Sequence, residues 1–172
     1  MRLFIALDIP EEIKNQIDEI KSQIKIDGKA NFMKTNDIHL TLKFLGDVED
    51  PETIKQTLPQ ISFEPFKLTT SELGVFPSEK RINVLWLGLK DHTKLVELKK
   101  QIDSALPNFT DNHKFHAHLT IARIKFINNK QEFLEQFKKI KLNPISFKIE
   151  NFKLYKSTLT PEGPIYEELE VF

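Results

Sequence analysis

Apolar residues recur along this chain in an order that is found twice. Residues 3–7 and residues 84–89 are short apolar runs, each of a length typical of a strand. After each run, apolar residues return at intervals of three or four, which predicts an amphipathic helix. The two stripes are Ile13, Ile17, Ile20 and Ile24 after the first run, and Leu95, Leu98, Ile102 and Leu106 after the second. The pattern therefore predicts a strand followed by a helix in two places.

The tripeptide His-Leu-Thr occurs in the next predicted strand of each copy. These strands are residues 38–44 and 116–122, and both alternate between apolar and polar positions with several β-branched side chains. The spacing agrees, because 36 positions separate the start of the first apolar run from its histidine, and 34 separate the start of the second run from its own. Each copy then continues with a helix, at 51–60 or 130–140, and with a strand that contains Phe-Lys-Leu, at 66–68 or 152–154.

We interpret the two copies as a diverged duplication, with repeats of about 1–79 and 80–172. Strands and helices in this order, without glycine-rich crossovers, predict an α+β protein of two sheets with helices on their outer faces. The length fits a single bilobal domain, 1–172, with the lobes related by a pseudo-twofold axis. Glycine and proline in GVFPS at 74–78, followed by EKR at 79–81, predict the hinge between the halves.

The composition allows a real core and excludes several kinds of chemistry. The chain is 40% hydrophobic with 14 Phe, and it contains no cysteine, so thiol nucleophiles, iron–sulfur clusters and cysteine zinc sites are excluded. The first apolar run meets Asp8, Pro10 and two glutamates too soon for a signal peptide. No run approaches the roughly 20 apolar residues that a membrane-spanning helix needs. We therefore expect a cytoplasmic protein with no membrane partner.

Charge is balanced over the whole chain but not along it. The 25 basic and 25 acidic residues argue against a protein that coats long nucleic acid through many phosphate contacts. Residues 113–156, however, contain 10 basic and 3 acidic side chains. This segment is either a solvated lysine-rich face or a surface that attracts a phosphate group.

The two His-Leu-Thr strands carry the candidate chemistry. Because side chains alternate on a strand, His39 and Thr41 share one face, as do His118 and Thr120, while the residues between them can fill the core. Phosphodiester cleavage needs a base for the attacking oxygen, an acid for the leaving oxygen, and donors around the nonbridging oxygens. Two imidazoles that titrate near pH 6.5 and two hydroxyls supply these roles without a metal.

Chance is a poor explanation for two such motifs. With 5 His and 11 Thr in the chain, roughly 0.3 His-x-Thr sequences are expected at random. The alternative is that each histidine is hydrogen-bonded inside a sheet and each threonine serves only as a good strand former. The matched surroundings of the two motifs favour the functional interpretation.

On these residues the chain resembles the 2H phosphoesterases, and within them the RNA 2',3'-cyclic phosphodiesterases, also called the 2'-5' RNA ligase family. The resemblance covers nearly the whole chain. Its motifs are RLFIAL at 2–7, HLTLKFLG at 39–46, LGVFP at 73–77, VLWLG at 84–88, HLTIAR at 118–123, LYKS at 154–157, and LTPEGP at 159–164 with Tyr166.

The resemblance implies a bilobal α+β fold in which two antiparallel sheets line a central cleft. It implies hydrolysis of a terminal 2',3'-cyclic phosphate to a 2'-phosphate, with His39 as proton donor to O3' and His118 as proton acceptor for water. Thr41 and Thr120 would hold the phosphate oxygens. Family members also join RNA ends through a 2'-5' linkage, which fits the same acid and base working in reverse without a nucleotide cofactor.

The expected substrates are RNAs with 2',3'-cyclic phosphate ends, among them tRNA fragments, or small cyclic nucleotides. We expect a monomer that needs no cofactor. Sequence spacing alone leaves the acid and base roles interchangeable, because the two motifs are nearly identical.

Three further residues are candidates for substrate binding. Arg123 matches the family position associated with phosphate, but strict alternation places it on the face opposite His118, so a β-bulge would be required. Phe4 could stack a terminal base or belong to the core. Lys43 is expected on the face of His39, where it would add positive charge near the phosphate or remain a surface lysine. The family often has proline where this chain has Ala117.

Two rival interpretations remain. His113, His116 and His118 could form a metal site, which predicts activity that is lost to chelators and restored by zinc or manganese. Alternatively, the protein binds RNA ends or nucleotides without turnover, which predicts salt-sensitive binding through several phosphate contacts.

Overall fold

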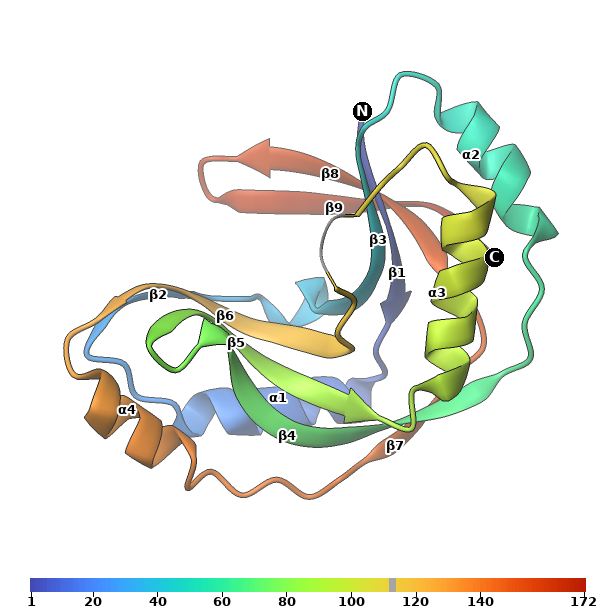
Figure 1. Cartoon of the computed structure of the whole chain (residues 1–172). Coiled ribbons are helices and arrows are strands. Elements are labelled where there is room, and N and C mark those ends of the chain that lie inside the picture. Colours follow the sequence, from blue (N-terminus) through green and yellow to red (C-terminus); the bar gives the residue numbers. More distant parts are fainter. Residues whose placement is uncertain (112–113) are drawn as a thin grey trace.

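Two antiparallel sheets and the helices that pack on them make up the molecule (Figure 1). The computed structural model describes residues 1–111 and 114–172. In chain order the elements are β1 (Arg2–Asp8), α1 (Glu11–Gln23), β2 (Gly28–Phe32), the short 3-10 helix η1 (Thr35–Asp37), β3 (His39–Asp47), α2 (Pro51–Thr57), the 3-10 helix η2 (Leu58–Gln60), β4 (Phe66–Ser78), β5 (Arg81–Lys90), α3 (Thr93–Ala105), β6 (His118–Ile127), α4 (Lys130–Phe137), β7 (Ser146–Ile149), β8 (Lys153–Thr160) and β9 (Gly163–Val171).

Each sheet takes strands from both halves of the chain. The first has the order β3-β1-β8-β9 and the second the order β2-β6-β5-β4-β7. β4 belongs to the first repeat but pairs with β5 of the second, and β8 belongs to the second repeat but pairs with β1 of the first. The α+β class with two antiparallel sheets is thus confirmed. The lobes are interlocked, because β2 and β4 of the first half lie in the second sheet, and β8 and β9 of the second half lie in the first sheet.

The central strands of the two sheets are buried because both of their faces are covered. In β1 the five residues between Arg2 and Asp8 are all buried, and Leu3, Ile5 and Leu7 belong to one hydrophobic core cluster that also includes residues of β5 and the helices. α1 begins after Pro10 with two glutamates in its first turn, where the helix dipole favours negative charge. The isoleucine stripe of α1 faces the core, as its spacing predicts.

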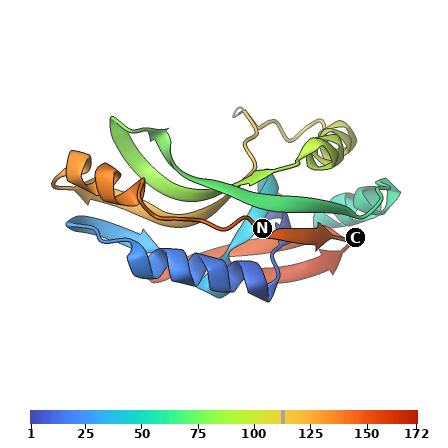
Figure 2. The ribbon, with the colours of Figure 1, turned by 90° about the horizontal axis from the view of Figure 1, so that it is seen from below.

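The two long helices lie on opposite sides of the strands (Figure 2). α3 packs against β3 of the first sheet. α1 is tied to both edges of the second sheet, because Gln16 Nε2 donates to the Asn143 carbonyl before β7 and Lys21 Nζ donates to the Met33 carbonyl after β2. Over the two described ranges, no helix is long and apolar enough to span a membrane.

The prediction of a hinge at 74–78 is wrong. These residues belong to β4, which pairs with β5 up to Ser78 opposite Arg81, so the two strands form a hairpin rather than a joint between lobes. Gly74 serves a close approach instead of a turn. A Cβ at this position would lie 2.1 Å from a carbon of the Trp86 indole, so only glycine leaves room for that ring.

Candidate active site

The two His-Leu-Thr motifs begin equivalent strands, β3 and β6, which lie against each other. His39, Thr41, His118 and Thr120 are half-buried, whereas the residues between and after them are fully buried core. We call the side of each sheet that carries its histidine the inner face. Within the described ranges, neither Thr41 nor Thr120 makes a hydrogen bond through its hydroxyl, so both hydroxyls are available to hydrogen-bond a ligand.

Both histidine rings are held in the same way. His39 Nδ1 lies 2.7 Å from the carbonyl oxygen of Asp37, and His118 Nδ1 lies 2.7 Å from that of His116. A carbonyl can only accept, so Nδ1 carries the proton in both rings and Nε2 is left to gain or lose one. Each motif therefore presents one imidazole nitrogen, in a fixed tautomer, two residues before a hydroxyl.

Burial sets the direction of both histidine pKa values. Burial lowers the pKa of His39, while its bond to the Asp37 carbonyl and the charges of Asp8 and Asp37 oppose this shift. Burial also lowers the pKa of His118, and the charges of His116 and Arg123 lower it further against the effect of its carbonyl bond. The two motifs share their geometry but differ in electrostatic surroundings.

The bulge that Arg123 requires is present in β6. Thr120 lies opposite Trp86 and Ala122 lies opposite Leu85, which leaves Ile121 without a partner in the ladder. The extra residue reverses the alternation, so Arg123 returns to the inner face with His118 and Thr120. Burial raises the pKa of Tyr166 on β9, and the charge of Arg123 opposes this shift.

An equivalent bulge in β3 contradicts the expectation for Lys43. Thr41 lies opposite Ala6 and Lys43 opposite Ile5, so Leu42 is the extra residue and Lys43 turns away from the face of His39. Lys43 is only 3% exposed and its Nζ lies 2.6 Å from Asp103 of α3. Phe44 takes the inner-face position instead, with 60% of its side chain exposed.

Lys43 of β3 and Lys99 of α3 share the carboxylate of Asp103. Both Nζ atoms lie 2.6 Å from Asp103 Oδ1, and both lysines are largely buried. We expect Asp103→Ala to lower the free energy of unfolding by roughly 1–3 kcal/mol, because two buried ammonium groups lose their partner. The Asp103 side chain is 41% exposed, so the loss should be smaller than for a fully buried ion pair.

Urea unfolding of Asp103→Ala and of Asp103→Ala with Lys43→Met measures this effect. The second substitution removes one unpaired charge, so the double variant should recover part of the stability. Equal stability of wild type and Asp103→Ala would contradict this account of the cluster.

Aromatic rings surround His39. Phe4 lies beneath it at a ring distance of 4.8 Å, and Phe4 stacks on Tyr155 at 5.3 Å. Tyr166 meets His39 edge to face at 5.0 Å. Phe4 is only 2% exposed, so it has no open surface for a terminal base and instead supports the His39 ring. Phe44, whose ring lies 6.2 Å from that of Phe4, has a largely exposed side chain.

A second set of rings surrounds His118. Phe76 meets His118 edge to face at 5.0 Å and lies 5.0 Å from Trp86, whose indole is 8% exposed. Trp86 also lies 4.8 Å from the ring of His116. These contacts limit how far the His118 ring can move.

Asp8 is a charged neighbour of His39 that the sequence did not reveal. Asp8 lies directly opposite His39 in the β1–β3 pairing. Tyr155 donates a short hydrogen bond to its carboxylate, and Lys153 Nζ lies 2.6 Å from its other oxygen. Burial alone would raise the pKa of Asp8, but the bonds from Lys153 and Tyr155 lower it. Asp8 is therefore a stable anion beside the imidazole.

The metal site proposed from His113, His116 and His118 includes a residue outside the described ones, since His113 is not among them. Among residues 1–111 and 114–172, no group of three or more His, Asp or Glu is arranged to hold a metal ion. His118 and His116 instead interact through the Nδ1–carbonyl bond, and their ring centres are 5.9 Å apart.

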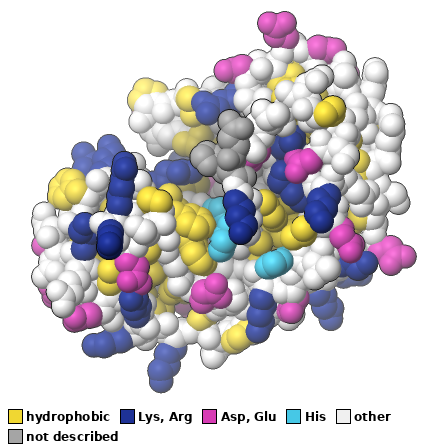
Figure 3. Space-filling model, in the orientation of Figure 1, with side chains coloured by type: hydrophobic (Ala, Val, Ile, Leu, Met, Phe, Trp, Pro, Cys, Tyr) yellow, Lys and Arg dark blue, Asp and Glu magenta, His cyan; other side chains and the backbone are white. Residues whose placement is uncertain are grey.

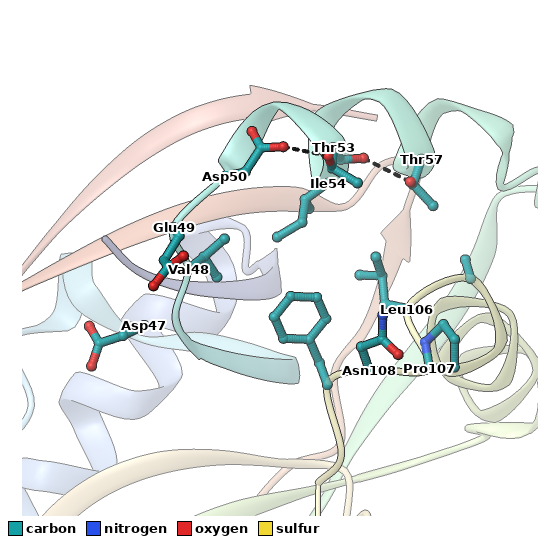
Figure 4. A pocket seen from close by; sticks show the side chains of 12 residues that line it. Asp47, Val48, Glu49, Asp50, Thr53, Ile54, Thr57, Leu106, Pro107 and Asn108 are labelled. Carbon is teal, nitrogen blue, oxygen red and sulfur yellow. Dashed lines mark hydrogen bonds between the residues drawn. The ribbon is translucent and has the colours of Figure 1, made fainter.

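On the face shown in Figure 3, histidine side chains reach the surface near the centre, among hydrophobic side chains and several lysines or arginines. A separate pocket lies between the start of α2 and the segment after α3 (Figure 4). Its wall is apolar, with Ile54, Leu106 and Phe109, and acidic residues line its rim. No candidate catalytic residue lines this pocket.

Two interlocked lobes that each supply a histidine and a threonine from an equivalent bulged strand are the arrangement expected of a two-histidine phosphoesterase. A sequence model of the 2'-5' RNA ligase superfamily matches residues 9–160, and the chain belongs to this family. It is 42% identical over 174 residues to an RNA 2',3'-cyclic phosphodiesterase of Methanocaldococcus jannaschii, with 99% of each protein covered. A protein of the same name from Thermotoga maritima is 36% identical, over 98% of this chain and 93% of that protein.

Solved structures agree with this assignment. Escherichia coli LigT in its apo form has a TM-score of 0.77 at 26% identity, with 99% of this chain and 95% of that chain covered. LigT has also been crystallised in complex with 3'-AMP. TT0787 of Thermus thermophilus shares the fold, with a TM-score of 0.81 at 23% identity over 100% of this chain and 97% of that chain.

Proposed function

We propose that this protein hydrolyses the 2',3'-cyclic phosphate at RNA ends to a 2'-phosphate by metal-independent general acid–base catalysis. One observation carries the proposal. Two histidines on equivalent strands have Nδ1 fixed by a backbone carbonyl, and each is followed by a threonine hydroxyl that has no partner among the described residues. Relatives named RNA 2',3'-cyclic phosphodiesterase support the substrate class.

His118 accepts a proton at Nε2 from a water molecule, whose oxygen attacks phosphorus. The bond from phosphorus to O3' breaks, and His39 donates its Nε2 proton to O3'. The product carries a 2'-phosphate and a free 3'-hydroxyl. The two histidines end with their protonation states exchanged, so His118 must release a proton to solvent and His39 must take one up before the next turnover.

The remaining groups stabilise the phosphate. Thr41 and Thr120 donate hydrogen bonds to nonbridging oxygens, where negative charge gathers in the transition state. Arg123, brought to the inner face by the bulge, adds a permanent positive charge near His118. Phe44 offers an exposed ring on the inner face for the terminal base, the role first considered for Phe4.

The same acid and base, working in reverse, would serve 2'-5' ligation of RNA ends without a nucleotide cofactor. Substrates include RNA fragments such as those of tRNA and, at the small end of the range, cyclic nucleotides, because the groups that act on phosphorus need contact only the terminal nucleotide.

Incubation of an RNA oligonucleotide ending in a 2',3'-cyclic phosphate, with and without EDTA, tests the proposal. We expect a 2'-phosphate product in both cases, resolved from the 3'-phosphate by electrophoresis. Loss of turnover in EDTA with recovery on zinc or manganese would establish the metal-dependent rival. Binding of the oligonucleotide without turnover would establish the binding-module rival.

A further inference from the structure

The two lobes differ in charge at positions that the strand pairing makes equivalent. In the first lobe Asp8 lies opposite His39, and in the second lobe Gly88 lies opposite His118. Each His strand bulges at its fourth residue, which makes Phe44 of the first lobe equivalent to Arg123 of the second. The first lobe thus has an added carboxylate, and the second an added guanidinium.

The carboxylate beside His39 is held firmly. Tyr155 donates to one oxygen of Asp8, and Lys153 Nζ lies 2.6 Å from the other. Lys153 also lies 2.6 Å from Glu168 of β9, so the three ionised groups together carry a net charge of −1. The Tyr155 ring is stacked near His39 at 6.2 Å, which ties this network to the imidazole.

The second lobe has no room for an equivalent carboxylate. A Cβ at Gly88 would lie 2.9 Å from Ser71 Oγ and 3.0 Å from the Trp86 ring, so a larger side chain would have to displace its neighbours. The charged or titratable groups that act on His118 are His116 and Arg123. Those that act on His39 are Asp8 and Asp37. The local packing therefore maintains the difference in charge.

We propose that Asp8, fixed by Tyr155 and Lys153, is a positioning residue that favours the imidazolium form of His39 and so makes His39, and not His118, the proton donor. This inference rests on the proposed function and explains how a duplicated site acquires two different roles. Asp8 acts through His39 and needs no contact with the substrate. Arg123 has the complementary effect on His118, which must be neutral to accept a proton.

The proposal fixes the sign of two pH effects. The donor must be protonated, so loss of its proton sets the high-pH limb of the kcat/KM profile, while the acceptor sets the low-pH limb. Removing the Asp8 charge should lower the pKa of His39 and move the high-pH limb downward. Removing Lys153 leaves the Asp8 charge less compensated, so the same limb should move upward. The Tyr155 and Tyr166 phenols face His39 but stay neutral, because burial raises both pKa values.

The test compares Asp8→Asn and Lys153→Met with wild type on the RNA 2',3'-cyclic phosphate substrate across pH. We expect the high-pH limb to shift by roughly 0.5 to 1 unit, downward for Asp8→Asn and upward for Lys153→Met, with the low-pH limb unmoved; this is the scale of a partly exposed charge near an imidazole. Glu167→Gln is the matched control, because Glu167 pairs with Lys156 on the same hairpin but on its other face.

An NMR titration of the His39 ring without substrate gives a second readout that does not depend on turnover. The midpoint of the His39 titration should move downward in Asp8→Asn and upward in Lys153→Met, as the high-pH limb does. Unchanged midpoints, a shift of equal sign in both variants, or movement of the low-pH limb would overturn the role of Asp8. Absence of turnover by wild type would instead refute the proposed function, and the titration would still decide whether Asp8 acts on His39.

Discussion

Replacing either His39 or His118 with alanine should reduce kcat/KM on the RNA 2',3'-cyclic phosphate by about 10²- to 10⁴-fold, the contribution of a positioned general acid or base. Each histidine presents a single free nitrogen, because its Nδ1 is bonded to a carbonyl. Acid and base serve the same step, so the double variant should be little worse than either single variant. Single-turnover measurements with the cyclic phosphate oligonucleotide determine the effect.

Three controls separate a chemical role from a structural one. His92→Ala removes an exposed histidine at the start of α3 and should leave activity unchanged. Thermal unfolding should show that the His39 and His118 variants still fold. Added imidazole should restore part of the activity of His39→Ala, because the gap above Phe4 and beside Tyr166 can admit a free ring. A folded His39→Ala protein with full activity would exclude His39 as the proton donor.

The sequence predicted those elements whose apolar residues recur with a clear period. α1 and α3 lie where their stripes indicated, and β1, β3, β5 and β6 match the predicted strands to within a few residues. β2 and β9 were not predicted because neither strand has a buried face. Their side chains are exposed or half-exposed, so their sequences show no apolar–polar alternation. The exchange of β4 and β8 between sheets could not be predicted, because pairing depends on the assembled fold.

The candidate site shows the same division between local pattern and long-range pairing. Alternation within one strand was enough to place His39 with Thr41 and His118 with Thr120. It was not enough for Lys43, because the register shift at Leu42 depends on how β3 pairs with β1. Asp8 was missed for a related reason, since only that pairing brings it opposite His39. The duplication offered a signal for Lys43. A bulge was already required to bring Arg123 to the face of His118, and an equivalent bulge in the first copy would have turned Lys43 away from His39.

The threonine hydroxyls should matter almost as much as the histidines. Thr41→Val and Thr120→Val keep the shape of the side chain but remove the donor, and each should lower kcat/KM by roughly 10²- to 10³-fold, as loss of one oxyanion donor does elsewhere. Other threonine hydroxyls are hydrogen-bonded within the protein. That of Thr69 bonds to the Ser146 hydroxyl, and that of Thr70 accepts a bond from the Ile145 amide. Thr41 and Thr120 have no such bond in the described ranges, so their hydroxyls are available to the phosphate.

Serine variants and a distant valine make this prediction specific. Thr41→Ser and Thr120→Ser retain the hydroxyl and should recover most of the activity, whereas Thr158→Val, an exposed position on the opposite face of β8, should have no effect. Negative charge on the nonbridging oxygens grows toward the transition state, so the valine substitutions should lower kcat more than they raise KM. Full activity in both valine variants would mean that backbone amides or Arg123 alone bind the phosphate, and the symmetric four-group description of the site would have to be abandoned.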